Sequence, residues 1–175
     1  MAIAKKKTAE LKAAKKTAKK AAKAAAPPKF KLRKLGAKEA ATVSPYLTIR
    51  GGKAAVELYK KAFGAKVRML MEAEDKKRLM HATLLINGGE VLLSDVFDEY
   101  DDGASKAPTD AKTTTVTIHL QVDDADKWWD RAVASGLKIT MPLADQFWGD
   151  RYGRLLDPFG HAWSIGAEIK KKKKK

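Results

Sequence analysis

Side chains able to do chemistry alternate with aliphatic ones in three segments of the sequence. The polar members of these segments are Tyr46 and Thr48, His81 and Thr83, and Thr117, His119 and Gln121. Imidazoles bind metals or move protons, whereas hydroxyl and amide groups orient a ligand by hydrogen bonds. These side chains could line a ligand site, or they could face water, as one face of an antiparallel sheet often does.

A second candidate site is the aromatic and basic segment at 147–154, which contains two glycines. Phe147 and Trp148 could stack on a flat or cationic ligand, while Arg151 or Arg154 holds an anion. The alternative is structural: an ion pair between Asp150 and an arginine that locks the loop.

The segment that follows carries three structural expectations. Asp157 begins a turn with Pro158, Phe159 and Gly160 rather than acting as a catalytic acid, and His161, directly after it, should lie at the surface. Trp163 should pack beneath a helix. No nucleophile elbow or glycine-rich phosphate cradle occurs in the chain.

The predicted strands and helices that position these residues occur twice along the chain, in the same order. Two glycines that each end a helical stretch, Gly64 and Gly136, lie 72 positions apart, and both halves share the order strand, helix, strand, strand, turn, strand. Apolar stripes at helical spacing precede both glycines, and Asp123 offers an N-cap to the second helix. The sequence therefore predicts an α+β fold of two tandem βαβββ modules, about 43–97 and 113–167, joined by a loop at 98–112. The predicted sheet is mixed and curved, with the helices outside and a concave cavity inside.

Charge divides the chain into a body and two tails. The 175 residues carry a net charge of +15, but residues 1–38 alone hold 13 lysines, Arg33 and the single acid Glu10, and six lysines end the chain. We expect a disordered basic tail and linker at 1–42, a folded domain at 43–169 and a lysine tail at 170–175. Cysteine is absent, which excludes disulfides and thiolate metal sites.

The lysines of the first tail could release counterions from nucleic acid and bind it without reading its sequence, or they could simply be solvated. The candidate contacts are Lys5, Lys6, Lys7, Lys15, Lys16, Lys19 and Lys20. No apolar run is long enough for a membrane span. We expect a cytoplasmic protein with no membrane partner, and the basic tails raise association with the nucleoid as an alternative to a freely diffusing protein.

The body resembles a known family in several segments. VSPYLTIR at 43–50, AVELYKKAFGA at 55–65, LMHATL at 79–84 and FWGDRYGRLLDPFGHAWSI at 147–165 are similar to the PhnB-like branch of the glyoxalase/bleomycin-resistance/dioxygenase superfamily. The resemblance implies a U-shaped cavity, usually in a homodimer. It also implies metal-ligand positions at Ser44, Thr83, Thr117 and Ser164, where hydroxyls replace the usual His, Gln or Glu.

These observations predict a protein that binds a small molecule without a metal and without a cofactor. The expected lining comprises Tyr46, Thr48, His81, Thr83, Thr117, His119, Gln121 and Ser164, covered by Trp148 and Arg154. One alternative is a metal-dependent lyase, isomerase or dioxygenase with ligands displaced to His81 and His119. Another is an accessory protein that its tails tether to DNA.

Overall fold

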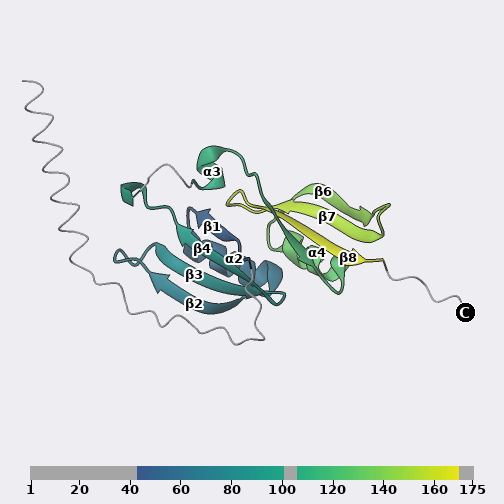
Figure 1. The fold of residues 1–175 in the computed structure, drawn as a ribbon, viewed down its shortest axis with the longest axis horizontal. Coiled ribbons are helices and arrows are strands. Elements are labelled where there is room, and N and C mark those ends of the chain that lie inside the picture. The colour runs from purple at the N-terminus through teal and green to yellow at the C-terminus, as the bar shows by residue number, and fades with distance from the viewer. Residues whose placement is uncertain (1–42, 101–105, 170–175) are drawn as a thin grey trace, which may run out of the picture. The chain divides into compact units, whose positions relative to one another are not determined.

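The computed structural model describes residues 43–100 and 106–169. Within them the chain forms two modules of equal topology, shown in Figure 1. Module 1 contains β1 (Tyr46–Ile49), α2 (Gly52–Phe63), β2 (Lys66–Glu72), β3 (Leu79–Ile86) and β4 (Gly89–Asp95). Module 2 contains β5 (Thr117–Gln121), α4 (Ala125–Ala134), β6 (Lys138–Asp145), β7 (Asp150–Leu156) and β8 (Ala162–Glu168). The predictions for the tails at 1–42 and 170–175 fall outside the described residues.

Each module folds its four strands into one mixed sheet. The strand orders are β1-β4-β3-β2 and β5-β8-β7-β6. In both sheets the first strand runs parallel to the last and the remaining pairs are antiparallel. The α+β class and the tandem βαβββ modules are thus confirmed, as two hydrogen-bonded sheets of four strands each.

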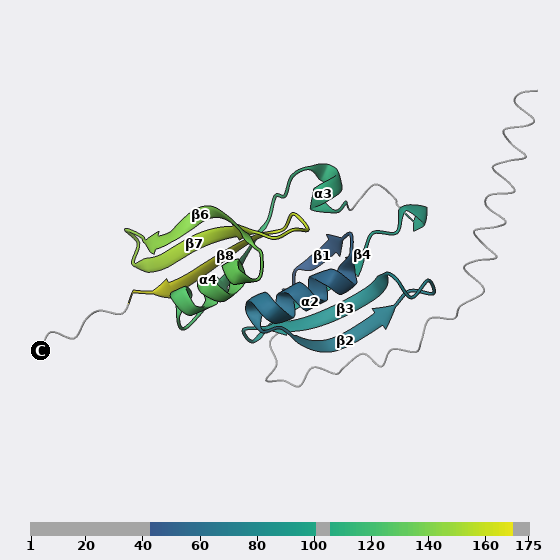
Figure 2. The same ribbon diagram turned by 180° about the vertical axis from the view of Figure 1, so that it is seen from behind.

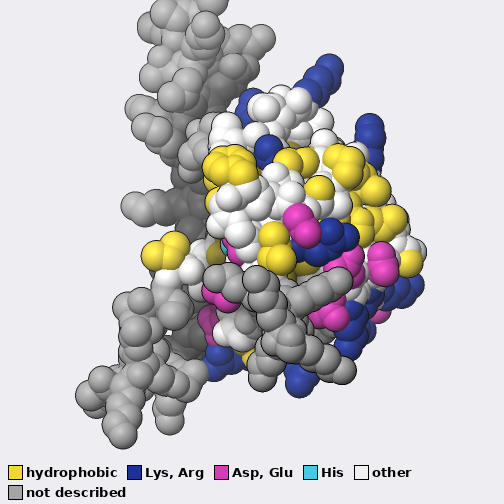
Figure 3. All heavy atoms as spheres, turned by 90° about the vertical axis from the view of Figure 1, so that its right-hand side faces the viewer, with side chains coloured by type: hydrophobic (Ala, Val, Ile, Leu, Met, Phe, Trp, Pro, Cys, Tyr) yellow, Lys and Arg dark blue, Asp and Glu magenta, His cyan; other side chains and the backbone are white. Residues whose placement is uncertain are grey.

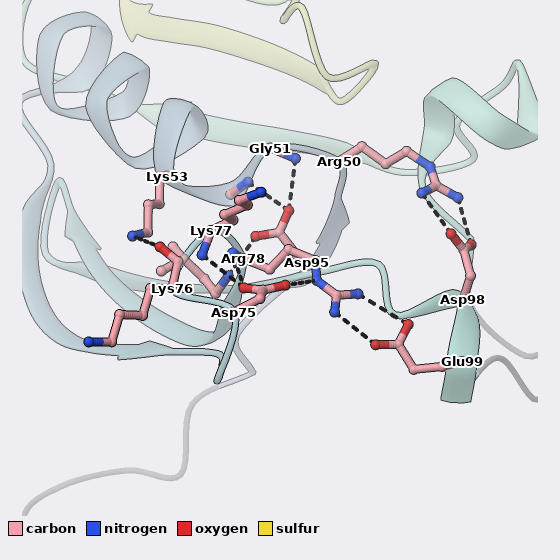
Figure 4. A network of polar contacts seen from close by, with 12 residues as sticks. Arg50, Gly51, Lys53, Asp75, Lys76, Lys77, Arg78, Asp95, Asp98 and Glu99 are labelled. Atoms are coloured by element: carbon pink, nitrogen blue, oxygen red, sulfur yellow. Dashed lines mark hydrogen bonds and ion pairs between the residues drawn. The ribbon is translucent and has the colours of Figure 1, made fainter.

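The linker between the modules is more ordered than a plain loop. It contains a 3-10 turn, η1 (Asp98–Tyr100), and a short helix, α3 (Pro108–Ala111). Arg50 forms ion pairs with Asp98 from the turn and with Asp110 from the helix. Figure 4 shows Arg50 and Arg78 reaching the acids of η1 from module 1.

The helices form where apolar side chains recur at helical spacing. The buried stripe of α2 contains Ala55, Tyr59 and Ala62, and Gly64 ends the helix in the left-handed conformation that glycine favours. Helix α4 buries Ala125, Trp129 and Ala132 in the same spacing.

The N-cap of α4 is Asp124 rather than Asp123. The Asp124 carboxylate accepts a hydrogen bond from the Lys127 backbone N–H at 3.1 Å. Asp123 instead accepts the indole N–H of Trp128, at 3.2 Å. Adjacent aspartates offer the same cap chemistry, so the prediction was off by one position.

Both helices lie on one face of their own sheet, as Figure 2 shows, and they also pack on each other. The core continues across the two modules: Trp163 of β8 is fully buried, with its ring 4.5 Å from that of Phe63 and 5.2 Å from that of Tyr59 in α2. The expectation that Trp163 packs beneath a helix is confirmed, although the aromatic residues it stacks on belong to the helix of the other module. Among the described helices, none lies on the opposite face of either sheet.

A buried carboxylate joins the modules. Asp157, only 3% exposed, accepts the hydroxyl of Tyr59 at 2.7 Å and the indole N–H of Trp163 at 2.9 Å. It also accepts the backbone N–H groups of Phe159 and His161, each at 2.9 Å. The predicted turn at 157–160 is present, and its first residue ties it to helix α2.

Module 1 has its own buried carboxylate at the end of β4. Asp95 accepts the backbone N–H groups of Gly51 and Gly52, at the start of α2, and of Leu79 in β3. A side chain on Gly52 would have its Cβ 2.7 Å from the Asp95 carboxylate, so this close approach requires glycine. Figure 4 shows Asp95 beneath the first turn of the helix.

His161 corrects one expectation. It is buried, with 7% of its surface exposed, rather than at the surface, because the turn folds inward against module 1. Burial lowers the pKa of His161 below its ordinary value of 6.5, while the charge of Asp157 and a hydrogen bond with the Thr48 backbone oppose that shift. The Nε2 atom has no hydrogen-bond partner among the described residues.

None of the helices that the structure describes is long and apolar enough to cross a membrane.

We predict that Asp157→Ala lowers the free energy of unfolding by about 3 kcal/mol or more. Two buried donors, on Tyr59 and Trp163, would lose their acceptor, and each unsatisfied donor costs roughly 1–3 kcal/mol. Urea denaturation measures the change. Asp157→Asn keeps one oxygen acceptor and should cost less. Asp130→Ala, on the exposed side of α4, is the control; equal losses for Asp157→Ala and Asp130→Ala would contradict the role given to Asp157.

A second prediction concerns acid. Because the unfolded chain protonates His161 more readily than the folded chain does, the stability contributed by the neutral ring is complete above about pH 6.5 and declines below it. Urea midpoints between pH 7.5 and pH 5.5 should fall more steeply for the native protein than for His161→Gln. If the urea midpoints of the two proteins fell equally with pH, the prediction would be wrong, because His161 would then have the same pKa in the folded and the unfolded chain.

Candidate ligand-binding faces

The helix-free face of each sheet, called here its open face, carries most of the polar residues singled out in the sequence. In module 1 the alternation of β1 and β3 places Tyr46, Thr48, His81 and Thr83 there, while Leu47, Ile49, Ala82 and Leu84 enter the core. In module 2 the open face carries Thr117, His119 and Gln121 from β5, Arg154 from β7 and Ser164 from β8.

The open face of module 1 holds a chain of three hydrogen-bonded side chains. The Tyr46 hydroxyl lies 3.0 Å from His81 Nδ1, and His81 Nε2 lies 2.9 Å from the Thr83 hydroxyl. Both ring nitrogens of His81 are therefore engaged within the sheet. Beside this chain, Arg68 pairs with Glu90, so the arginine of this face has an acidic partner.

The open face of module 2 repeats this pattern with different partners. His119 Nδ1 lies 2.9 Å from the Ser164 hydroxyl, and His119 Nε2 lies 2.9 Å from Gln121 Oε1. Because an amide oxygen only accepts, His119 Nε2 carries the proton and the Ser164 hydroxyl can donate to Nδ1. The Gln121 amide N–H groups stay available to a ligand.

A row of aromatic rings continues from His119 toward the β6–β7 hairpin. The Tyr152 ring stacks near His119 at 5.9 Å between centroids, and Trp148 meets Tyr152 edge-on at 5.7 Å. Phe147, 97% exposed, lies edge-on to Trp148 at 5.0 Å. Sequence reasoning missed Tyr152, although its position two residues before Arg154 in the same strand places it on the same face.

The two arginines of the hairpin segment have different roles. Arg151 pairs with Asp126 of α4 and Asp145 of β6, so the predicted partner Asp150 is wrong, although the structural role of the pair holds. Asp150 and Arg151 are neighbours in β7 and their side chains point to opposite faces. Arg154 instead donates a hydrogen bond to the Thr117 hydroxyl at 3.1 Å.

Figure 3 views the protein from the side of module 2 and shows hydrophobic side chains exposed between charged ones. Exposed hydrophobic residues of this module include Ile139, Phe147 and Trp148.

The structure thus assembles the predicted site residues into two groups. One group lies on each open face, and the side-chain hydrogen bonds join residues within a group. The two modules also meet where the Asn87 amide donates a hydrogen bond to the backbone carbonyl of Gln121 at 2.6 Å. A hollow lined by both groups stays a prediction.

The paired βαβββ modules match a known family model. Residues 44–165 match the model of the Glyoxalase/Bleomycin resistance protein/Dioxygenase superfamily. The chain belongs to this superfamily.

The chain is also similar to individual proteins over about three quarters of its length. An uncharacterised protein of Mycobacterium tuberculosis is 42% identical over 128 residues, which cover 73% of this chain and 75% of that protein. The crystal structure of TioX from Micromonospora sp. ML1 is similar with a TM-score of 0.60 and 24% identity, over 74% of this chain and 99% of TioX. A PhnB protein from Bacillus cereus has a TM-score of 0.52 and 17% identity, over 73% of this chain and 99% of that one. The resemblance to PhnB-like proteins is thus confirmed as a likeness of fold.

The residues present do not fit the metal centre that the superfamily resemblance implies. Thr83, Thr117 and Ser164 lie on the open faces and Ser44 lies before β1, and all four supply hydroxyls rather than imidazole or carboxylate. No group of three or more His, Asp or Glu residues able to hold a metal occurs among residues 43–100 and 106–169. We therefore assign no reaction step to a metal.

Proposed function

We propose that this chain is a metal-independent member of the glyoxalase/bleomycin-resistance superfamily that binds and sequesters a small molecule. The observation that carries this proposal is the state of the two imidazoles. His81 and His119 each have both ring nitrogens in hydrogen bonds to neighbours on their own sheet. They orient the polar surface, and a metal could bind either ring only by displacing one of these hydrogen-bond partners.

We further propose that the working unit is a homodimer. Each open face is one wall, and the two sheets of the chain share no hydrogen-bonded strand pair among the described residues. A second copy would supply further walls of both kinds, so that a module 1 face and a module 2 face could enclose one ligand. The unknown small molecule would then contact Tyr46 and His81 from one wall and His119 and Gln121 from the other, while the buried hydroxyls of Thr83 and Ser164 hold the two imidazoles.

The alternative is a metal-dependent lyase, isomerase or dioxygenase with displaced ligands. For that chemistry His81 would have to release Thr83 or Tyr46, and His119 would have to release Gln121 or Ser164. Each release gives up a hydrogen bond worth about 1 kcal/mol. This cost is small, so the alternative is best tested directly.

The test is native mass spectrometry of the purified protein, combined with elemental analysis before and after dialysis against a chelator. We expect a dimer that retains small molecules and keeps its ligand occupancy after chelation. Stoichiometric Ni, Zn, Mn or Fe whose removal abolishes ligand retention would favour the metal-dependent alternative. His81→Gln and His119→Gln should alter ligand retention without changing the metal content.

A second proposed function rests on the charge of the tails. Residues 1–38 carry a net charge of +13 and the last six residues are all lysine. We propose that these tails contact nucleic acid without reading its sequence, in a cytoplasmic protein that associates with the nucleoid. The folded domain would then be held near DNA while its open faces bind their ligand.

Gel-shift titrations of the full chain and of a chain lacking residues 1–38 test the tails. We expect the full chain to bind duplex DNA, with an affinity that falls steeply between 50 mM and 200 mM salt because lysines release counterions. The truncated chain should bind far more weakly. Equal binding by the two chains would contradict the tether.

A further inference from the structure

The open face of module 2 has a charge gradient along its strands. Strand pairing gives the order: Lys138 is opposite Leu156, Arg154 is opposite Ser164, Tyr152 is opposite Gly166, and Asp150 is opposite Glu168. Residues opposite each other in an antiparallel pair lie on the same face. The basic side chains therefore lie at one end of this face and Tyr152 in the middle, while the acids lie at the other end, next to the β6–β7 hairpin that carries Phe147 and Trp148.

The basic end lacks a compensating acid. Arg50, Arg68, Arg78 and Arg151 each pair with a carboxylate. Arg154 bonds the Thr117 hydroxyl instead, and neither Arg154 nor Lys138 has an acidic partner among the described residues. Asp150 lies four residues along the strand from Arg154, or about 13 Å at roughly 3.3 Å per residue. That separation exceeds the screening length of about 8 Å at physiological ionic strength.

In the middle of the face, Gly166 leaves space for the ring of His119 beside Tyr152. Gly166 lies between Tyr152 and Gln121 in the ladder, and a Cβ there would lie 2.9 Å from His119 Cε1 and 3.4 Å from Gln121 Oε1. Its backbone does not require glycine, because φ is not in the left-handed region. The missing side chain gives space in which the His119 ring lies near Tyr152 while bonded to Ser164 and Gln121.

The basic end and the middle of this face offer hydrogen-bond donors. The Arg154 guanidinium retains N–H groups beyond the one given to Thr117, and the Gln121 amide N–H groups point away from the bond that its oxygen accepts. Tyr152 offers an aromatic ring about 6.6 Å along the strand from Arg154, a spacing that a planar molecule with an acidic group can bridge.

We propose that the open face of module 2 binds a planar aromatic carboxylate. The carboxylate accepts hydrogen bonds from Arg154, near the charge of Lys138, and the ring lies against Tyr152 with Trp148 at its far edge. The inference rests on the proposed small-molecule function and names the chemical class of its ligand. The acids at the far end, Asp150 and Glu168, fix the orientation because they repel a carboxylate placed there.

Two probes of equal shape test the proposal: 2-naphthoate and its neutral analogue 2-naphthamide, titrated into the full chain by calorimetry. We expect the naphthoate to bind at least tenfold more tightly, since hydrogen bonds between ionised partners are about twice as strong as neutral ones. Arg154→Gln should remove that difference and leave naphthamide binding unchanged. Lys61→Gln, the same loss of charge on the exposed side of α2, is the control.

Two further variants test the ring site. Trp148→Ala should weaken both probes alike, since it removes ring contact and no charge. Gly166→Ala should weaken both by displacing His119, whereas Gly89→Ala in β4, where a Cβ meets only ordinary contacts, should not. Thermal melts of each variant confirm that it is folded.

The possible outcomes distinguish a wrong ligand class from a wrong proposed function. Equal affinity for the two probes would overturn the carboxylate inference and leave small-molecule binding in place. No binding of either probe at millimolar concentration would overturn the inference, while ligand retention in native mass spectrometry would still decide the broader function. A preference for naphthoate that survives Arg154→Gln would place the anion elsewhere and overturn the assigned site.

Discussion

The buried carboxylate of Asp157 is the interaction on which the joining of the two modules depends. It accepts four hydrogen bonds: the hydroxyl of Tyr59 from module 1, and the indole of Trp163 and two backbone N–H groups from module 2. A buried carboxylate is costly unless such partners surround it. Burial and the nearby negative charge of Asp157 raise the pKa of Tyr59, which keeps its hydroxyl protonated as a donor.

The packing at this junction determines which faces of the two sheets lie outside the hydrophobic core. Because Tyr59, Phe63 and Trp163 form one aromatic core, the helices of both modules serve the packing between modules. The helix-free faces are left with polar side chains that have little part in that core. The hydrophobic core and the proposed ligand site thus use opposite faces of the same strands, and Thr83 and Ser164 of the open faces are themselves buried.

The strands and helices could be predicted from the sequence, but the contacts that join the two modules could not. Alternation in β3 and β5 predicts which side chains share a face, and the repeat of the glycine-terminated helices predicts two modules. Asp157 and Tyr59, by contrast, are 98 residues apart, and the turn that contains Asp157 has the composition of an exposed turn. The burial of His161 follows from the same long-range packing, which local patterns do not encode. The partners of Arg151 likewise depend on how α4 and β6 approach β7.

The two open faces differ in their side chains, although the two modules have the same strand order. In module 1 the guanidinium of Arg68 in β2 pairs with Glu90 in β4, across β3, and the imidazole of His81 is held by two hydroxyls. In module 2 the corresponding surface has an arginine bonded only to a hydroxyl, beside a row of aromatic rings. Because both modules share the same strand order and strand directions, this difference comes from the side chains that the strands carry. Among the described residues, the open face of module 1 has its arginine paired with an acid, and the open face of module 2 does not.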